Sequence, residues 1–102
     1  MSNTALDEIR LRRSLVLQVL HGQYPYPLVR TALERGVIDY YARDTRALER
    51  DLEYLAKKGY LEARSDDVLP GRVVHSYQLT PSGVDLVEGA TQDPGILFVQ
   101  GR

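Results

Sequence analysis

One stretch in the middle of the chain constrains the fold more than any other. Asp44 is a good N-cap for a helix, and glycine, here Gly59, is the residue type that most often follows a helix end. Between them, three leucines recur at the i, i+4 and i+7 spacing of one helical face: Leu48, Leu52 and Leu55. The pattern predicts an amphipathic helix from position 44 to about position 58, with one face buried in a core.

The hydrophobic period changes directly after this helix. Residues 60–64 and 73–79 fit the period of strands better than that of helices. Residues 65–72, between them, contain the turn formers Asp, Pro and Gly. This segment predicts a β-hairpin with a loop of several residues.

Two helices are predicted before the central one. The first begins at Thr4, which has a capping-box-like Asp three residues later, and ends at Gly22. Pro27 fits the first turn of the second helix, and Gly36 is expected to end it. Residues 37–43 would then form the turn before the third helix.

A last helix and a tail follow the hairpin. Thr80 is a suitable N-cap and Pro81 a suitable first helical residue, and the helix fades at Gly89. We therefore expect a domain of residues 1–89, mainly α with a small β-hairpin. A tail of residues 90–102 would follow it, containing the apolar run from Ile96 to Val99.

Three helices followed directly by a hairpin form the winged helix-turn-helix arrangement. Residues 48–61, ending in Lys-Gly-Tyr-Leu, resemble the third helix and wing entry of the MarR, ArsR and PadR families. Residues 77–83, with Leu-Thr-Pro-Ser-Gly, are similar to their Leu-Thr-x-x-Gly at the wing exit. The resemblance implies a three-helix core, a two-stranded wing and a C-terminal helix.

The chain also resembles a family of small proteins encoded in Mu-like phages and prophages. The likeness covers residues 12–17, Arg-Arg-Ser-Leu-Val-Leu, and the third helix. It implies a phage or prophage setting and adds no mechanism.

In winged helices the third helix normally enters the major groove of double-stranded DNA, and the wing contacts the backbone or the minor groove. The outer face of the third helix here mixes arginines with Glu49 and Glu53. An ordinary solvated face is the alternative, because several of these charges attract one another at i,i+3 and i,i+4. The residues that we expect to contact DNA are Arg43, Thr45, Arg46, Arg50, Lys57 and, at the hairpin tip, Arg72.

A homodimer would present two such helices to neighbouring half-sites. A second apolar stripe on the first helix and the apolar tail suggest the contact surface, made by Leu11, Leu15, Val19, Ile96, Leu97 and Phe98. That stripe could instead be covered by a later segment of the same chain. The predicted function is therefore a DNA-binding transcriptional regulator, and the alternative is a protein-interaction module that uses the tail and tyrosines such as Tyr40 and Tyr41.

Arg13 is a charged residue in the inner stripe of the first helix. A cation there must be paired or must extend outward to water. Asp51, on the flank of the third helix's inner face, is a plausible partner. We expect the pair to lock the first helix to the third.

Composition excludes several classes of function. The 102 residues make one small domain, and the formal charge of −1 is unlike that of strongly basic nucleic-acid binders. With no cysteine, disulfides and thiolate zinc sites are excluded. The N-terminus lacks signal-peptide features, and no apolar run approaches the roughly 20 residues of a membrane span. We expect a cytoplasmic protein, not an enzyme, with no metal, cofactor or membrane partner.

Overall fold

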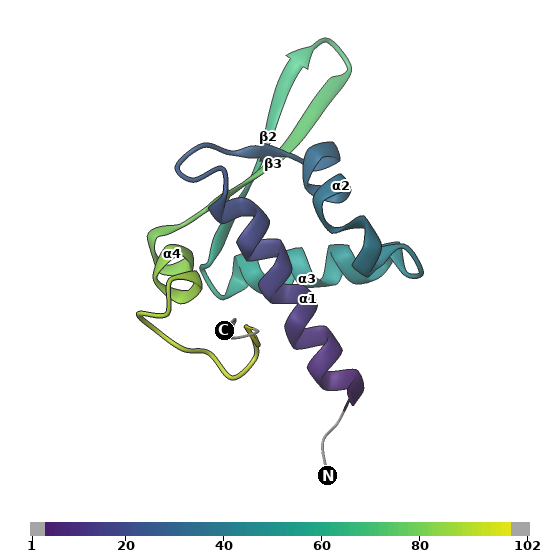
Figure 1. Ribbon diagram of the computed structural model, residues 1–102. Helices are drawn as coiled ribbons and strands as arrows, with labels where there is room; N and C mark the ends of the chain where they lie inside the picture. The colour runs from purple at the N-terminus through teal and green to yellow at the C-terminus, as the bar shows by residue number, and fades with distance from the viewer. Residues whose placement is uncertain (1–3, 99–102) are drawn as a thin grey trace.

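The computed structural model describes residues 4–98 of the chain (Figure 1). Within that range the chain forms four helices and one three-stranded antiparallel sheet, which confirms a helix-rich domain with a small β-component. The elements are α1 (Thr4–His21), β1 (Leu28–Val29), α2 (Arg30–Tyr41), α3 (Thr45–Lys57), β2 (Leu61–Leu69), β3 (Arg72–Leu79) and α4 (Pro81–Val87).

Helix α3 forms as its local sequence predicts. The Asp44 side chain accepts hydrogen bonds from the backbone N–H groups of Arg46 and Ala47, at 3.1 and 3.3 Å. Gly59 follows the helix with φ of +82°, a conformation that favours glycine. The three leucines of the predicted inner stripe are buried, in a core to which α1, α2, α4 and the sheet also contribute.

Helix α2 differs from the prediction at both ends. It begins at Arg30 and runs through Gly36 to Tyr41, so only residues 42–44 separate it from α3. A Cβ on Gly36 would lie 3.1 Å from Cγ1 of Val19. The glycine therefore does not end the helix; it allows α2 to pack closely against α1.

The two residues before α2 form a strand that the sequence did not predict. Leu28 and Val29 pair with Tyr77 and Ser76 of β3, and the strand order is β1-β3-β2. They were expected in the first turn of the second helix. Their backbone N–H and C=O groups pair with the edge of β3 instead, and this pairing satisfies them as a helix would.

The hairpin of β2 and β3 is longer than predicted and projects away from the helices (Figure 1). Ser65 pairs with His75, and Asp67 with Val73, so most of the expected loop is strand. The reversal is confined to residues 70–71, where Gly71 has φ of +77°. The prediction from turn-forming residue types made the loop too long, because cross-strand pairing continues past these residues.

Helix α4 is joined to the α3–β2 turn by Thr80 and Gly83. The Thr80 hydroxyl accepts from the backbone N–H of Gly83 at 3.1 Å and donates to the carbonyl oxygen of Gly59 at 2.6 Å. A Cβ on Gly83 would collide with the carbonyl oxygen of Tyr60. The Leu-Thr-x-x-Gly segment thus has a packing reason for its glycine.

The tail after α4 packs against its own domain. Ile96 is only 6% exposed within the core, and the backbone N–H of Leu97 donates to the carbonyl oxygen of Arg10 in α1 at 3.1 Å. The predicted boundary at residue 89 lies two residues after the end of α4, and the packed core continues beyond it. Val99 and the rest of the predicted tail lie outside the described residues, as does the side chain of the predicted cap Thr4.

Candidate nucleic-acid interface

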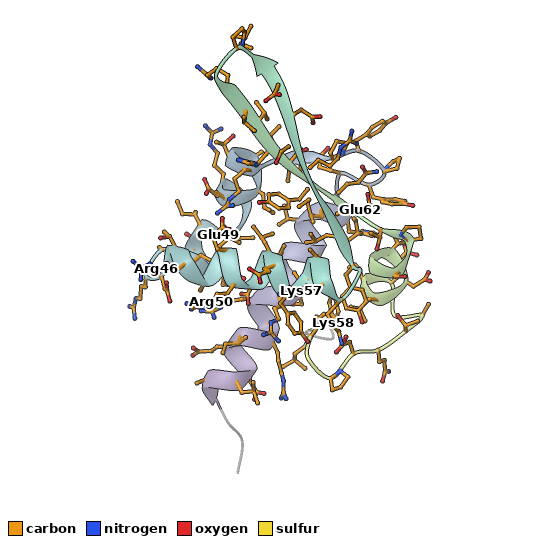
Figure 2. All side chains as sticks on the ribbon, turned by 180° about the vertical axis from the view of Figure 1, so that it is seen from behind. Arg46, Glu49, Arg50, Lys57, Lys58 and Glu62 are labelled. Carbon is orange, nitrogen blue, oxygen red and sulfur yellow. The ribbon has the colours of Figure 1, made fainter. Side chains whose placement is uncertain are left out.

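The outer face of α3 is exposed along its whole length (Figure 2). Burial of the leucine stripe fixes the rotation of the helix, and the opposite face then points to solvent. Figure 2 shows Arg46 near one end of α3 and Lys57 near the other. The exposed charged residues of this face are Arg46, Glu49, Arg50, Glu53 and Lys57.

Two of the predicted DNA-contacting cations are held in exposed ion pairs. Arg50 lies 3.1 Å from the N-cap carboxylate of Asp44, and its hydrogen bond lowers the pKa of that carboxyl group. Lys57 lies 2.8 Å from Glu53, and their hydrogen bond lowers the pKa of the Glu53 carboxyl group and raises the pKa of the Lys57 amine. Charge on the C-terminal half of the outer face is thereby balanced.

Glu49 also has a partner, which the sequence did not indicate. It pairs with Arg30, at the start of α2, rather than with Arg46 one turn before it. Arg30 additionally donates to the Tyr77 hydroxyl at 3.2 Å. The acid most able to neutralise Arg46 is therefore occupied by another helix.

Arg43 and Arg46, which flank the start of α3, are the uncompensated cations of this region. Both are exposed, and within residues 4–98 neither guanidinium forms an ion pair or a hydrogen bond. Thr45, between them, is exposed as well. The N-terminal end of α3 therefore offers two free positive charges and a hydroxyl.

The hairpin carries balanced charge. Arg72 is exposed at the tip, beside Gly71, as predicted. Arg64 is exposed on β2, together with Asp66 and Asp67. Two arginines and two aspartates between positions 64 and 72 leave this part of the hairpin without net charge, so it attracts phosphate less than the start of α3 does.

On its inner side, α3 carries a buried acid that binds α1 and α2. Asp51 is 3% exposed and lies 3.4 Å from the Arg13 guanidinium, which confirms the predicted pair. Arg12 lies 3.9 Å away. The Tyr41 hydroxyl donates to Asp51 at 2.6 Å, and burial together with this hydrogen bond raises the Tyr41 pKa.

Tyr41 corrects a prediction. We expected it in an exposed turn as a contact for a protein partner, but α2 continues to this residue and turns its ring into the core. Tyr40, beside it, is 54% exposed. The hydrogen bond with Asp51 was missed because the length of α2 was underestimated.

Asp93 is a second buried acid, and it fixes the tail. Its carboxylate accepts from the Tyr60 hydroxyl at 2.5 Å and from the Gly95 N–H at 2.7 Å, and it lies 2.9 Å from Lys58. Burial opposes ionisation, but these bonds hold the pKa of Asp93 below its usual value. Burial and the bond to Asp93 raise the Tyr60 pKa to about 12. The sequence did not indicate these contacts.

Half of the six predicted dimer-surface residues are covered, fully or in part, by the chain itself. Val19 packs against Gly36 of α2, Ile96 is buried and Phe98 packs against the core. Ile96 is therefore not available to a second copy, and Val19 and Phe98 are half-buried against other segments of the same chain. The rest are more open: Leu97 is exposed, and Leu11 and Leu15 line a groove of about 630 Å³ beside Tyr40.

No protein-family model, no curated protein and no solved structure matches the chain. Over residues 4–98, no helix is both long and apolar enough to cross a membrane. The same residues contain no cluster of three or more His, Cys, Asp or Glu side chains that could hold a metal ion.

Proposed function

We propose that this chain is a winged helix-turn-helix protein that binds double-stranded DNA through the start of α3. The observation that carries the proposal is the pair of exposed, unpaired arginines, Arg43 and Arg46, on either side of the α3 N-cap. The order helix, strand, helix, helix, hairpin supports it, since this is the order in which a winged helix presents its third helix to DNA. The role in transcription and the phage setting rest on the resemblances in the sequence.

The other two cations of α3, Arg50 and Lys57, would contact DNA after Arg43 and Arg46 have bound it. The Arg50–Asp44 and Lys57–Glu53 pairs are exposed, and such pairs contribute little to stability. A nearby phosphate can therefore compete for Arg50 or Lys57 at little cost. Arg46 and Arg50, one turn apart, would reach guanine edges or phosphates, Thr45 would donate to a phosphate, and Arg72 would provide a distant contact from the hairpin.

A salt titration tests the proposal. Binding of the full chain to a labelled mixed-sequence duplex, followed by fluorescence anisotropy, should weaken as salt rises, with log affinity falling about 0.9 per phosphate contact. The double variant Arg43→Ala with Arg46→Ala should reduce that slope by about 1.8. Arg35→Ala, which removes an exposed arginine from α2, is the matched control and should leave the slope unchanged.

Two outcomes would contradict DNA binding at this face. One is wild-type binding that does not depend on salt. The other is an affinity that the double variant leaves intact. Either result would favour the second candidate function.

The second candidate is a protein-interaction module. It is favoured by the hairpin. The side chains of Val68, Leu69 and Val73 near its tip are each more than half exposed, and residues 64–72 carry no net charge. In this case Val73→Ser with Leu69→Ser should abolish capture of a protein partner, and the α3 arginine variants should not. A homodimer is compatible with both functions.

A further inference from the structure

The outer edge of β2 has no partner among the described residues. In the order β1-β3-β2, strand β2 lies at the edge of the sheet, and its residues 62–69 are exposed. Within residues 4–98, no segment other than β3 pairs with it. A long exposed edge strand is a template for another strand, unless charge or shape prevents pairing.

Charges on this edge are spaced so that a second copy can neutralise them. Arg64 and Asp66 are two residues apart, so their side chains lie on the same face of β2. In an antiparallel pair of β2 strands centred on Ser65, Arg64 of each copy lies opposite Asp66 of the other. Two ion pairs form across the junction, with no like charges directly opposed on that face.

Other registers are worse. Centring on Arg64 or on Asp66 sets that residue against itself, with like charges opposed. Centring on Ala63 also sets Glu62 opposite Arg64, but it carries residue 70 at the hairpin tip to the level of residue 56, within α3 of the other copy, whereas centring on Ser65 carries it only to residue 60. A shift by one residue sets outward-facing backbone groups against inward-facing ones, so the ladder cannot form.

We propose that two copies of this chain pair edge to edge through β2, antiparallel and centred on Ser65, to form one continuous sheet. The hairpin projects from the helices, which leaves the outer part of this edge open to a second copy (Figure 1). The bulge between Asp67 and Leu69 limits regular pairing to the part of β2 before it. The inference goes beyond DNA binding and moves the dimer contact from α1 to the hairpin.

A charge exchange tests both the contact and its register. Sedimentation of the full chain should give twice the monomer mass of 11.5 kDa. Arg64→Asp alone and Asp66→Arg alone each set like charges opposite one another twice, so each should raise the dimer dissociation constant at least about tenfold. The double variant Arg64→Asp with Asp66→Arg restores opposite charges and should restore the dimer.

Arg72→Asp is the control. It makes the same charge reversal on the same hairpin, but on β3, and should leave the dimer intact. Circular dichroism of each variant should match that of the wild type, because these side chains are exposed.

Several results would overturn the proposal. They are a wild-type chain that sediments as a monomer, single variants that still dimerise, and a double variant that does not recover. Loss of the dimer in Arg72→Asp but not in Arg64→Asp would place the contact on β3 instead. None of these measurements involves DNA, so their failure is separate from failure of the proposed function.

Discussion

The two faces of α3 carry similar charged groups with opposite consequences. On the inner face, Asp51 is enclosed by Arg13 and Tyr41, and it joins three helices. On the outer face, Glu53 and Lys57 pair at 2.8 Å with both side chains more than two-thirds exposed. A buried charge that loses its partner is strongly destabilising, whereas an exposed pair is screened by water. The inner charges therefore maintain the fold, and the outer ones are free to bind a partner.

Removing the inner acid should have the largest effect. Asp51→Ala leaves the guanidinium of Arg13 and the hydroxyl of Tyr41 without their acceptor, and we expect a loss of about 3–5 kcal/mol in the free energy of unfolding. Urea denaturation followed by circular dichroism measures it. A loss below about 1 kcal/mol would mean that water replaces the carboxylate and that the two faces do not differ.

Replacing Arg13 by lysine should have a smaller effect. The Arg13 guanidinium bonds Asp51, donates to the carbonyl oxygen of Gly95 at 3.0 Å and lies 3.7 Å from the centroid of the Tyr54 ring. A single ammonium group cannot make all three contacts, so Arg13→Lys should cost about 1–2 kcal/mol in the same assay. Full retention of stability would show that charge alone suffices at this position.

The next largest effect is expected from acid, which should weaken the attachment of the tail to the domain. Because the folded-state pKa of Asp93 lies below its ordinary value of 3.8, the ionised carboxylate stabilises the fold above that pH. The contribution is lost as pH falls through the folded pKa. The difference in unfolding free energy between wild type and Asp93→Asn should therefore be larger at pH 7 than at pH 3. An equal difference at both values would contradict a role for the charge.

The smallest effect is expected on the outer face. Glu53→Ala and Lys57→Ala remove one partner each from an exposed pair, and neither should change the urea midpoint measurably. Their matched comparison is Asp51→Ala, two residues before Glu53 along the chain and on the buried side of α3. A midpoint shift as large as that of Asp51→Ala would remove the distinction between the two faces.

Some features of the candidate site could be predicted from the sequence, and others could not. The cap at Asp44, the leucine stripe and the pair of Arg13 with Asp51 follow from residue type and helical spacing, and all three are present. Which outer arginines remain free did not follow. Arg46 is uncompensated because Glu49 is bound by Arg30, which lies nineteen positions earlier and on another helix.

What the sequence determined by itself is therefore local: the limits of α3, its buried face, a chain reversal within residues 65–72 and the start of α4. Caps, periodicity and turns act between residues a few positions apart, so the order of residues is sufficient to specify them. The tertiary structure alone decided that Gly36 continues a helix, that Leu28 joins a sheet and that Ile96 enters the core. Each of these depends on which distant segment lies against the residue, and packing of the whole chain sets that contact.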